Sequence, residues 1–238
     1  MRLLSLAVIA ILMLSSSCRF SSKKRITGDG DTKTEQRTAG TFHSVEVTGP
    51  FKVHVNQGAA TSIEVRADKN LLSYIETEND NGTLEIRTKR GYNLKFKKPV
   101  EIFITTSDYR MLSVTGSGEI LTGLINAERV EADVTGSGDI FLEVDAPEVR
   151  TEITGSGNIR VKGRARTLSS EINGSGELHA FNLLTENTSV DIAGSGDAEV
   201  FASKNLEIDI AGAGNIDYKG SPAIKKSVTG SGNIRKAD

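Results

Sequence analysis

The stretch VTGSGEI at residues 114–120 decides the fold, because six further copies of its pattern follow it along the chain. Each copy has an apolar residue, a small residue, Gly-Ser-Gly or Gly-Ala-Gly, an acid or amide, and a second apolar residue. The first glycines of successive copies are 20, 19, 19, 20, 18 and 18 residues apart. So constant a period indicates a repeat architecture. The glycine pairs are Gly116 and Gly118, Gly136 and Gly138, Gly155 and Gly157, Gly174 and Gly176, Gly194 and Gly196, Gly212 and Gly214, and Gly230 and Gly232.

The residues around each motif alternate between apolar and polar types. One alternating strand enters the glycine turn and a second leaves it, and a polar turn such as Asp145–Pro147 leads to the next copy. Two short strands and two turns in about 19 residues match one coil of a β-solenoid. Stacked coils would place equivalent residues in columns ~4.8 Å apart. Two interior columns are predicted: Val114, Val134, Ile153, Ile172, Ile192, Ile210 and Val228; and Ile120, Ile140, Ile159, Leu178, Ala198, Ile216 and Ile234.

The region before the repeats is also predicted to be β. Short alternating runs bounded by Gly, Pro, Asn or Asp occur from Val45 to Val114, with one helical turn expected within residues 68–76. The predicted fold is therefore all-β, a single-domain β-solenoid of about 19-residue coils with GSG corners. Its N-terminal β part covers residues 39–111, and the seven-repeat GSG part of the same domain covers residues 112–238.

The start of the chain predicts export and a lipid anchor. Arg2 precedes an apolar run at residues 3–14, and three serines then lead to Cys18, the one cysteine. The run is too short to span a bilayer and has the layout of a signal peptide over residues 1–17. The small residues before Cys18 resemble a lipobox, so Cys18 is the predicted lipidation site. Residues 18–38 are polar, without an apolar period, and predict a flexible tether after the lipidated cysteine.

Composition excludes several classes of function. The formal net charge is −2, so no global basic field favours nucleic acid. One cysteine excludes an intrachain disulfide framework and any cysteine-rich zinc site. Aromatic residues make up 5% and Trp is absent, which suits a thin interior of β-branched side chains.

The glycine motifs are interpreted as structural corners, because Gly accepts positive φ and close backbone approach. They lack the third Gly of a dinucleotide-binding loop and are followed by no helix. Calcium-binding β-rolls need GGxGxD, whereas here the polar residue directly follows the second Gly and is neutral in three of seven copies. Charges at outward positions, including Asp133 and Glu152, fit a solvated face. We therefore expect no catalytic, metal-binding or cofactor-binding residues.

One cluster of cations stands out from the charge background. Residues 87–98 contain no acid, and the cluster consists of Arg87, Lys89, Arg90, Lys95, Lys97 and Lys98. It would suit anionic glycans, lipid phosphates or a membrane surface. The sequence favours the structural alternative, an exposed edge strand in which Leu94 and Phe96 point inward while Lys95 and Lys97 face water.

The repeated strings TGSGEI, TGSGDI, TGSGNI and NGSGEL resemble the head GIN domain, a family of proposed auto-transporter adhesins common in lipoproteins of Bacteroidetes. FHSVEVTGPFKVHVNQG, at residues 42–58, resembles the opening of that domain. The resemblance runs from about residue 40 to the C-terminus. It implies an adhesin-like role, although fold alone does not assign a function.

The resulting expectation is a non-enzymatic lipoprotein of the cell envelope that presents a solenoid surface for a binding or structural role. The open alternatives are a β-helix enzyme acting on polysaccharide and a periplasmic scaffold without external ligand. Expected partners are the membrane, through the lipid anchor, and a glycan or envelope protein, but no nucleic acid. Self-association through an open solenoid end is compatible with the sequence. The expected location is the outer membrane, facing the periplasm or the cell surface.

Overall fold

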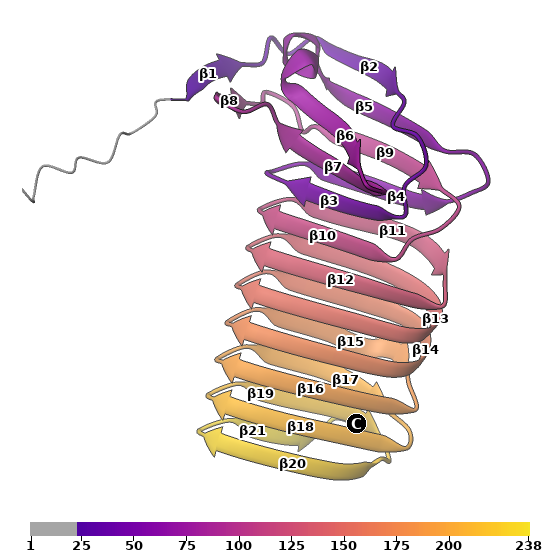
Figure 1. Ribbon diagram of the computed structural model, residues 1–238. Helices are drawn as coiled ribbons and strands as arrows, with labels where there is room; N and C mark the ends of the chain where they lie inside the picture. Colours follow the sequence, from indigo (N-terminus) through magenta and orange to yellow (C-terminus); the bar gives the residue numbers. More distant parts are fainter. Residues whose placement is uncertain (1–22) are drawn as a thin grey trace, which may run out of the picture.

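The computed structural model describes residues 23–238. The predicted signal peptide and Cys18 lie outside the described residues. Figure 1 shows a tall stack of flattened coils, with the N-terminal strands at one end and the C-terminal strands at the other. Hydrogen bonds join 19 strands into one continuous network, and β1 (Lys24–Thr27) and β8 (Tyr92–Lys95) form a separate two-stranded ribbon. The predicted β-solenoid is confirmed.

The strand network folds into two faces that enclose the core. It stays continuous because β13 (Asp139–Gly155) and β14 (Asn158–Gly174) each run round one edge of the stack. The front sheet contains β6 (Ile75–Asp80), β7 (Thr83–Thr88), β3 (Ser44–Thr48), β10 (Met111–Gly116), β12 (Arg129–Gly136), the second halves of β13 and β14, β16 (Asn187–Gly194), β18 (Asn205–Gly212) and β20 (Ala223–Gly230).

The back sheet lies behind it in Figure 1 and is built from the strands that leave each corner. It contains β2 (Thr32–Arg37), β5 (Ser62–Asp68), β9 (Glu101–Thr106), β4 (Lys52–Gln57), β11 (Glu119–Asn126), the first halves of β13 and β14, β15 (Glu177–Leu184), β17 (Asp197–Ala202), β19 (Asn215–Gly220) and β21 (Asn233–Lys236).

The strand register confirms both predicted interior columns. Val114 pairs with Val134, which pairs with Ile153, and the column continues to Val228. The second column runs in register from Ile120 to Ile234. All members are buried except those of the last coil, where Val228 is 41% exposed and Ile234 is half-buried. Stacked aliphatic side chains between two sheets thus form the core.

The two glycines of each corner are required for different reasons. Gly155 has a φ of +118°, and a Cβ there would lie 2.5 Å from the carbonyl oxygen of Gly136 in the preceding coil. Gly157 has no positive φ, but its Cβ would meet the Gly138 oxygen and the Val134 side chain. The corners are therefore packed backbone against backbone, which excludes any larger residue.

Two further coils lack the GSG motif. In β3 and β4 the corner is Thr48-Gly49-Pro50-Phe51, and Thr48 pairs with Thr115 across the coil boundary. In β7 and β9, which pair with β3 and β4 in parallel, residues 89–100 replace the short corner. The solenoid therefore begins before residue 112, and the region at 39–111 supplies coils of the same stack.

The N-terminal end of the stack is closed by antiparallel strands. β6 pairs with β7 on the front, while β5 pairs with β9 and β2 with β5 on the back. A 3₁₀ helix, η1 (Lys69–Tyr74), crosses between the sheets and buries Leu71 and Leu72, which places a helical turn where the sequence predicts one. These strands cover what would otherwise be an open sheet edge.

The predicted flexible tether is wrong for residues 24–37. β1 pairs in parallel with β8, and β2 pairs with β5 over six residues. The sequence TKTEQR of β2 carries no apolar period because the strand lies at the edge and its side chains are exposed or half-buried. Periodicity fails in such a strand because neither face is buried.

Residues 107–110 carry the chain from the N-terminal end past the β3–β4 coil to β10. Tyr109 is fully buried there, and its hydroxyl donates a hydrogen bond of 3.0 Å to the carbonyl oxygen of Asn56. Burial raises the pKa of the Tyr109 hydroxyl. Residues 107–110 thus connect the N-terminal strands to the GSG coils through a buried side chain.

Candidate binding surfaces

The acid or amide after each corner forms a ladder between coils. Asn158 Nδ2 donates to Asp139 Oδ1 at 2.8 Å, and Asn215 Nδ2 donates to Asp197 Oδ1 at 2.8 Å. At these two steps an amide donates to a carboxylate, so a hydrogen bond stands where two stacked acids would repel each other. These side chains and the fourteen corner glycines therefore have structural partners.

The cluster predicted at residues 87–98 divides into two parts. Arg87 is surrounded by Glu76, Glu78 and Glu85, with nitrogen–oxygen distances of 3.2 Å to Glu76 and 2.6 Å to Glu78. It is therefore neutralised and does not belong to a free anion-binding patch, so the sequence prediction is wrong for Arg87. Its three acidic partners lie outside the cluster, two on the neighbouring strand β6 and one earlier in β7.

The other cations of that cluster surround β8, in the loop that replaces a glycine corner. Lys89, Arg90, Lys95, Lys97 and Lys98 are exposed. As predicted, Leu94 and Phe96 are half-buried against the core. A groove of about 620 Å³ lies beside the strand, lined by Lys23, Pro50, Arg87, Lys89, Arg90, Tyr92 and Phe96 among others.

The outer face of the front sheet carries a column of acids. The parallel register stacks Asp133, Glu152, Glu171, Asp191 and Asp209 on successive coils. Burial and the neighbouring Glu152 and Glu131 raise the pKa of Asp133 to about 6, although Arg150 opposes this. Burial, Asp209, Glu171 and Glu207 likewise raise the pKa of Asp191. Acids held in register on neighbouring strands thus disfavour the charged forms of Asp133 and Asp191.

The outer face of the back sheet is different, because a row of cations crosses it. Arg160 and Lys162 lie on the back sheet, and Arg164 and Arg166 follow where β14 turns toward the front. All four are exposed. Lys162 pairs with Glu143 at 2.9 Å, whereas the three arginines are in no ion pair among residues 23–238. These four residues are called the β14 row.

Aromatic rings lie beside the row and along the same face. The Arg160 guanidinium is 5.2 Å from the centre of the Phe141 ring, and Lys219 Nζ is 5.0 Å from that of Phe181. Phe103 stacks on His54 with ring centres 4.6 Å apart. Cation–π contacts hold the cationic heads over apolar rings without neutralising them.

A shallow groove of about 360 Å³ lies between Phe141 and the first two residues of the row, Arg160 and Lys162. Its lining includes Leu121, Phe141, Arg160, Lys162, His179 and Asn182. The strands on either side are irregular, with register shifts between Leu121 and Leu124 and between Arg160 and Lys162. Such irregularities re-aim side chains, and Leu124 and Leu184 beside them are 49% and 52% exposed.

Sequence reasoning missed the β14 row. The usable signal was NIRVKGRAR at residues 158–166, in which every second residue from Arg160 is a cation and none is an acid. The alternation of residues within each repeat already predicts that the side chains at these positions face outward. They were overlooked because the strand falls within the repeats, whose glycines dominate the pattern.

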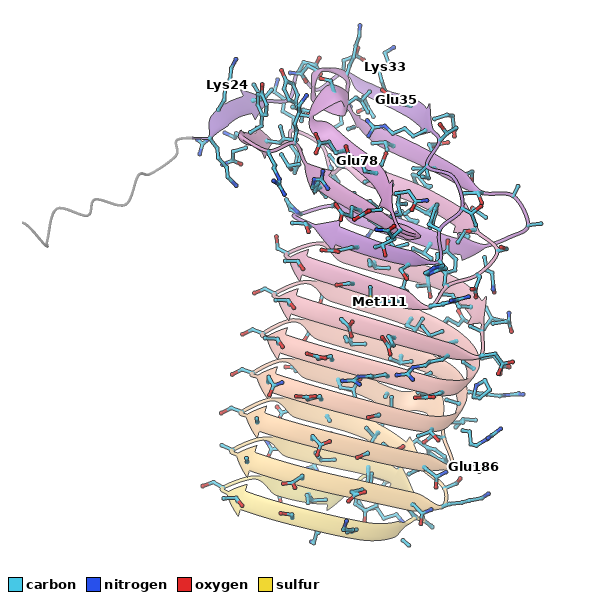
Figure 2. The ribbon with its side chains drawn as sticks, viewed as in Figure 1. Lys24, Lys33, Glu35, Glu78, Met111 and Glu186 are labelled. Carbon is cyan, nitrogen blue, oxygen red and sulfur yellow. The ribbon has the colours of Figure 1, made fainter. Side chains whose placement is uncertain are left out.

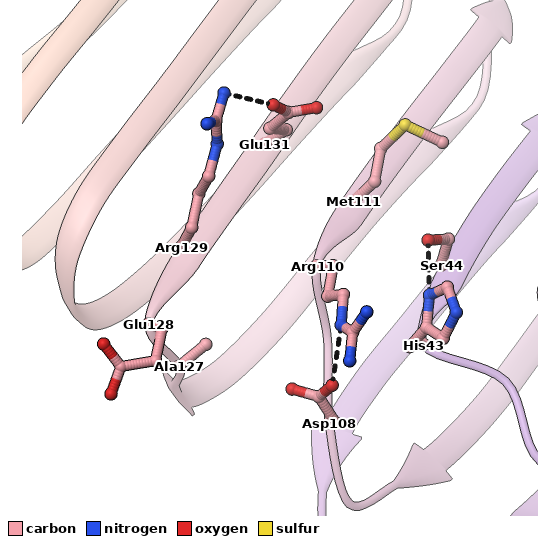
Figure 3. A pocket seen from close by; sticks show the side chains of 9 residues that line it. All are labelled: His43, Ser44, Asp108, Arg110, Met111, Ala127, Glu128, Arg129 and Glu131. Carbon is pink, nitrogen blue, oxygen red and sulfur yellow. Dashed lines mark hydrogen bonds and ion pairs between the residues drawn. The ribbon is translucent and has the colours of Figure 1, made fainter.

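A groove of about 500 Å³ on the front sheet, shown in Figure 3, has a different character. His43 Nδ1 lies 3.1 Å from Ser44 Oγ, which invites comparison with a catalytic pair. Asp108, however, accepts a hydrogen bond from Arg110 at 3.0 Å, and Ser44 is only 6% exposed. The groove therefore does not assemble the third member of a Ser-His-Asp triad.

Among the described residues, no group of three or more His, Cys, Asp or Glu side chains is placed to hold a metal ion. No helix in residues 23–238 is long and apolar enough to cross a membrane. Figure 2 shows charged side chains spread over the coils.

Solved structures from Bacteroidetes share this architecture. A putative adhesin from Bacteroides fragilis has a TM-score of 0.84 at 21% identity, covering 89% of this chain and 100% of that one. A putative lipid binding protein from Parabacteroides distasonis has a TM-score of 0.74 at 28% identity, covering 90% and 100%. A putative adhesin from Parabacteroides merdae has a TM-score of 0.72 at 23% identity, covering 90% and 100%. No curated protein matches the chain.

The sequence profile of one family matches residues 41–222, from the strand before the first corner to the penultimate coil. The match includes the β3–β4 coil, the cap strands β5 and β6 and the first six GSG corners, so it spans most of the described fold. The chain belongs to the family described as putative auto-transporter adhesin, head GIN domain (DUF2807).

Proposed function

We propose that this protein is a non-catalytic binding protein of the cell envelope, exported and anchored through acylated Cys18. Its ligand is an acidic glycan that lies across the outer face of the back sheet, over the β14 row. Membership of a family described as adhesins supports a binding role. The name of the Parabacteroides distasonis structure, a putative lipid binding protein, is in keeping with a place at the envelope.

The observation that carries the proposal is the β14 row beside its groove. Arg160, Arg164 and Arg166 have no described ion-pair partner, yet Phe141 and the flanking strands hold part of the row in place. A guanidinium can bind a carboxylate through two parallel hydrogen bonds. The edge of Phe141 and the exposed Leu124 offer apolar contact to the C–H faces of sugar rings. The row thus supplies both kinds of contact that an acidic sugar chain needs.

Nucleic acid fits this surface less well. The net charge is −2 and the front face carries an acidic column, so a dense polyanion is repelled by much of the molecule. The rings that a base would stack on are already occupied, Phe141 by Arg160 and Phe103 by His54. A glycan with one carboxylate for every one or two sugars has a lower charge density.

The test is equilibrium binding of an oligogalacturonate to the chain, with a neutral dextran oligosaccharide for comparison. The variant Arg160→Gln/Arg164→Gln/Arg166→Gln should bind at least about tenfold more weakly, because each lost charge-assisted hydrogen bond contributes roughly 1.5 kcal/mol or more. The matched control, Lys89→Gln/Arg90→Gln/Lys95→Gln, removes the same charge elsewhere and should bind like the parent.

Two outcomes would overturn the proposal. One is that the oligogalacturonate binds no better than dextran. The other is that the two triple variants lose affinity equally, which would mean that only net charge matters. Equal or tighter binding of single-stranded DNA would contradict the assignment to a glycan.

A further inference from the structure

The second surface, around β8, lies beside β1, the first described strand, at the N-terminal end of the stack (Figure 1). We infer that this end rests on the surface of an anionic phospholipid bilayer. The capped end then faces the membrane, and the GSG coils extend away from it. The inference rests on the proposed function only for the anchor; the docking surface itself is independent of the glycan face.

The corner loop of the β7–β9 coil supplies the first group of cations. Every GSG corner is closed by two glycines, whereas this corner is extended to residues 89–100 and carries a strand of its own. Lys89, Arg90, Lys95 and Lys98 are exposed, and none is in an ion pair among the described residues. The loop therefore replaces a structural corner with a charged surface.

The β1–β8 ribbon adds the second group. Arg25 pairs with Asn93 and Thr27 with Lys95, so these four share the face opposite the half-buried Ile26 and Leu94. Lys23 and Lys24 are exposed at the start of the ribbon. We call Lys23, Lys24, Arg25, Lys89, Arg90, Lys95 and Lys98 the ribbon patch.

The acids nearest the patch already have partners. Asp68 accepts a hydrogen bond from the backbone N–H of Lys97 at 3.1 Å, and Asp29 accepts one from the backbone N–H of Asp31 at 2.9 Å. The three glutamates around Arg87 are bound by it. None of the seven exposed cations is in an ion pair among the described residues, which leaves the patch positive although the whole chain is slightly negative.

The patch is suited to headgroups rather than to insertion. Tyr92 is held against Tyr74 with ring centres 4.6 Å apart, and Phe96 is 6.0 Å from Phe51, so the nearby aromatic rings pack against the body. What the patch offers to a membrane is positive charge, and each cation near an anionic surface adds to the attraction. Docking should therefore be electrostatic, peripheral and sensitive to salt.

Covalent geometry brings the patch to the membrane. Lys23 is five residue steps from Cys18, and a fully extended chain spans at most about 3.6 Å per step, or about 18 Å. The tether expected from sequence, to residue 38, would have allowed about four times that distance. Because the ordered ribbon begins at Lys24, an acylated Cys18 holds the patch close to the headgroups.

The experiment uses the chain from residue 19 onward, which carries no acyl anchor. Its folded part is complete, since the described strand pairings are all made among residues 24–236. Sedimentation with vesicles of phosphatidylcholine containing increasing phosphatidylglycerol should show binding that rises with phosphatidylglycerol and falls on adding salt. No binding at low salt would overturn the inference.

Two variants locate the surface. Lys89→Gln/Arg90→Gln/Lys95→Gln should reduce vesicle binding at least tenfold, while the matched Arg160→Gln/Arg164→Gln/Arg166→Gln should leave it within twofold. Equal losses would contradict a specific docking end. The variant Arg160→Gln/Arg164→Gln/Arg166→Gln is the one expected to bind oligogalacturonate more weakly. Each proposal therefore depends on a different variant, and one can fail while the other holds.

Orientation is read from an environment-sensitive dye on a single introduced cysteine, because this form lacks Cys18. Asn93→Cys places the dye on the ribbon face, and Ser231→Cys places it in the last corner, at the opposite end. Vesicles should shift the emission of the dye at position 93 and leave that at position 231 unchanged. A shift at 231 alone would show that the other end docks.

Discussion

Gly155 shows at the scale of one residue how the corners limit the sequence. Its positive φ and the carbonyl oxygen of Gly136 leave no room for a Cβ. We expect Gly155→Val to lower the free energy of unfolding by about 3 kcal/mol or more, since left-handed backbone alone costs a β-branched residue 1–3 kcal/mol. Thermal unfolding measures this.

Ser156, the exposed residue between the two glycines, provides the control for that variant. Ser156→Val adds a similar side chain in the same turn, and its melting temperature should stay close to that of the parent. If Gly155→Val melts like Ser156→Val, then the account of the corner is wrong.

Tyr109 tests the crossing between the cap and the repeats. Tyr109→Phe keeps the buried ring but removes the hydrogen bond to the Asn56 oxygen. Losing a part-buried hydrogen bond of this kind costs about 0.5–1.5 kcal/mol. Chemical denaturation should show a loss in this range. An unchanged midpoint would indicate that the bond contributes nothing to the junction.

At the scale of the elements, the acidic column on the front sheet predicts a pH dependence. The pKa of Asp133 is about 6 in the folded chain and near 3.8 when unfolded, so the folded state binds more protons between those values. Stability should therefore rise as pH falls from 7.5 toward 5. Melting temperature measured across this range should increase by a few degrees before other carboxylates titrate.

Asp133→Asn isolates this effect, because it removes the charge and keeps the shape. The variant should melt higher than the parent at pH 7.5 and show a smaller pH dependence. Asp217→Asn is the control, since Asp217 is paired with Arg235 at 2.6 Å. A parent whose stability is flat or falls as pH decreases from 7.5 to 5 would contradict the account of the column.

The elements also show what could be predicted from sequence. The repeat period placed Val134, Ile153 and their equivalents inside, because a fixed coil length forces a fixed register. β2 could not be found, since an exposed edge strand needs no apolar side chains. Arg87 was misassigned because its acidic partners lie on β6 and on its own strand, and the pairing with β6 is tertiary.

At the scale of the molecule, the two ends of the stack differ. The N-terminal end is capped, whereas β20 and β21 in the last described coil pair with neighbours on one side only. Lys226 occupies the column position of Ile208, and Lys236 that of Tyr218. Inward-pointing charges of this kind discourage edge-to-edge pairing.

We therefore expect Lys226→Ile/Lys236→Tyr to promote self-association through this end. Sedimentation velocity should show a larger species for the variant at concentrations where the parent is monomeric. The exposed pair Lys225→Ile/Arg235→Tyr changes the same charges on the outer faces and serves as the control. Association of both variants alike would argue against an effect of the column positions.

The most direct test of the proposed function is hydrogen–deuterium exchange of the chain with and without bound oligogalacturonate. The account predicts slower exchange in residues 139–166, which contain the first half of β14 and the strand beside it, with no change in the front strands β16 and β18. Protection confined to the front sheet, or to the β1–β8 ribbon, would contradict the assignment of the back face as the glycan-binding surface.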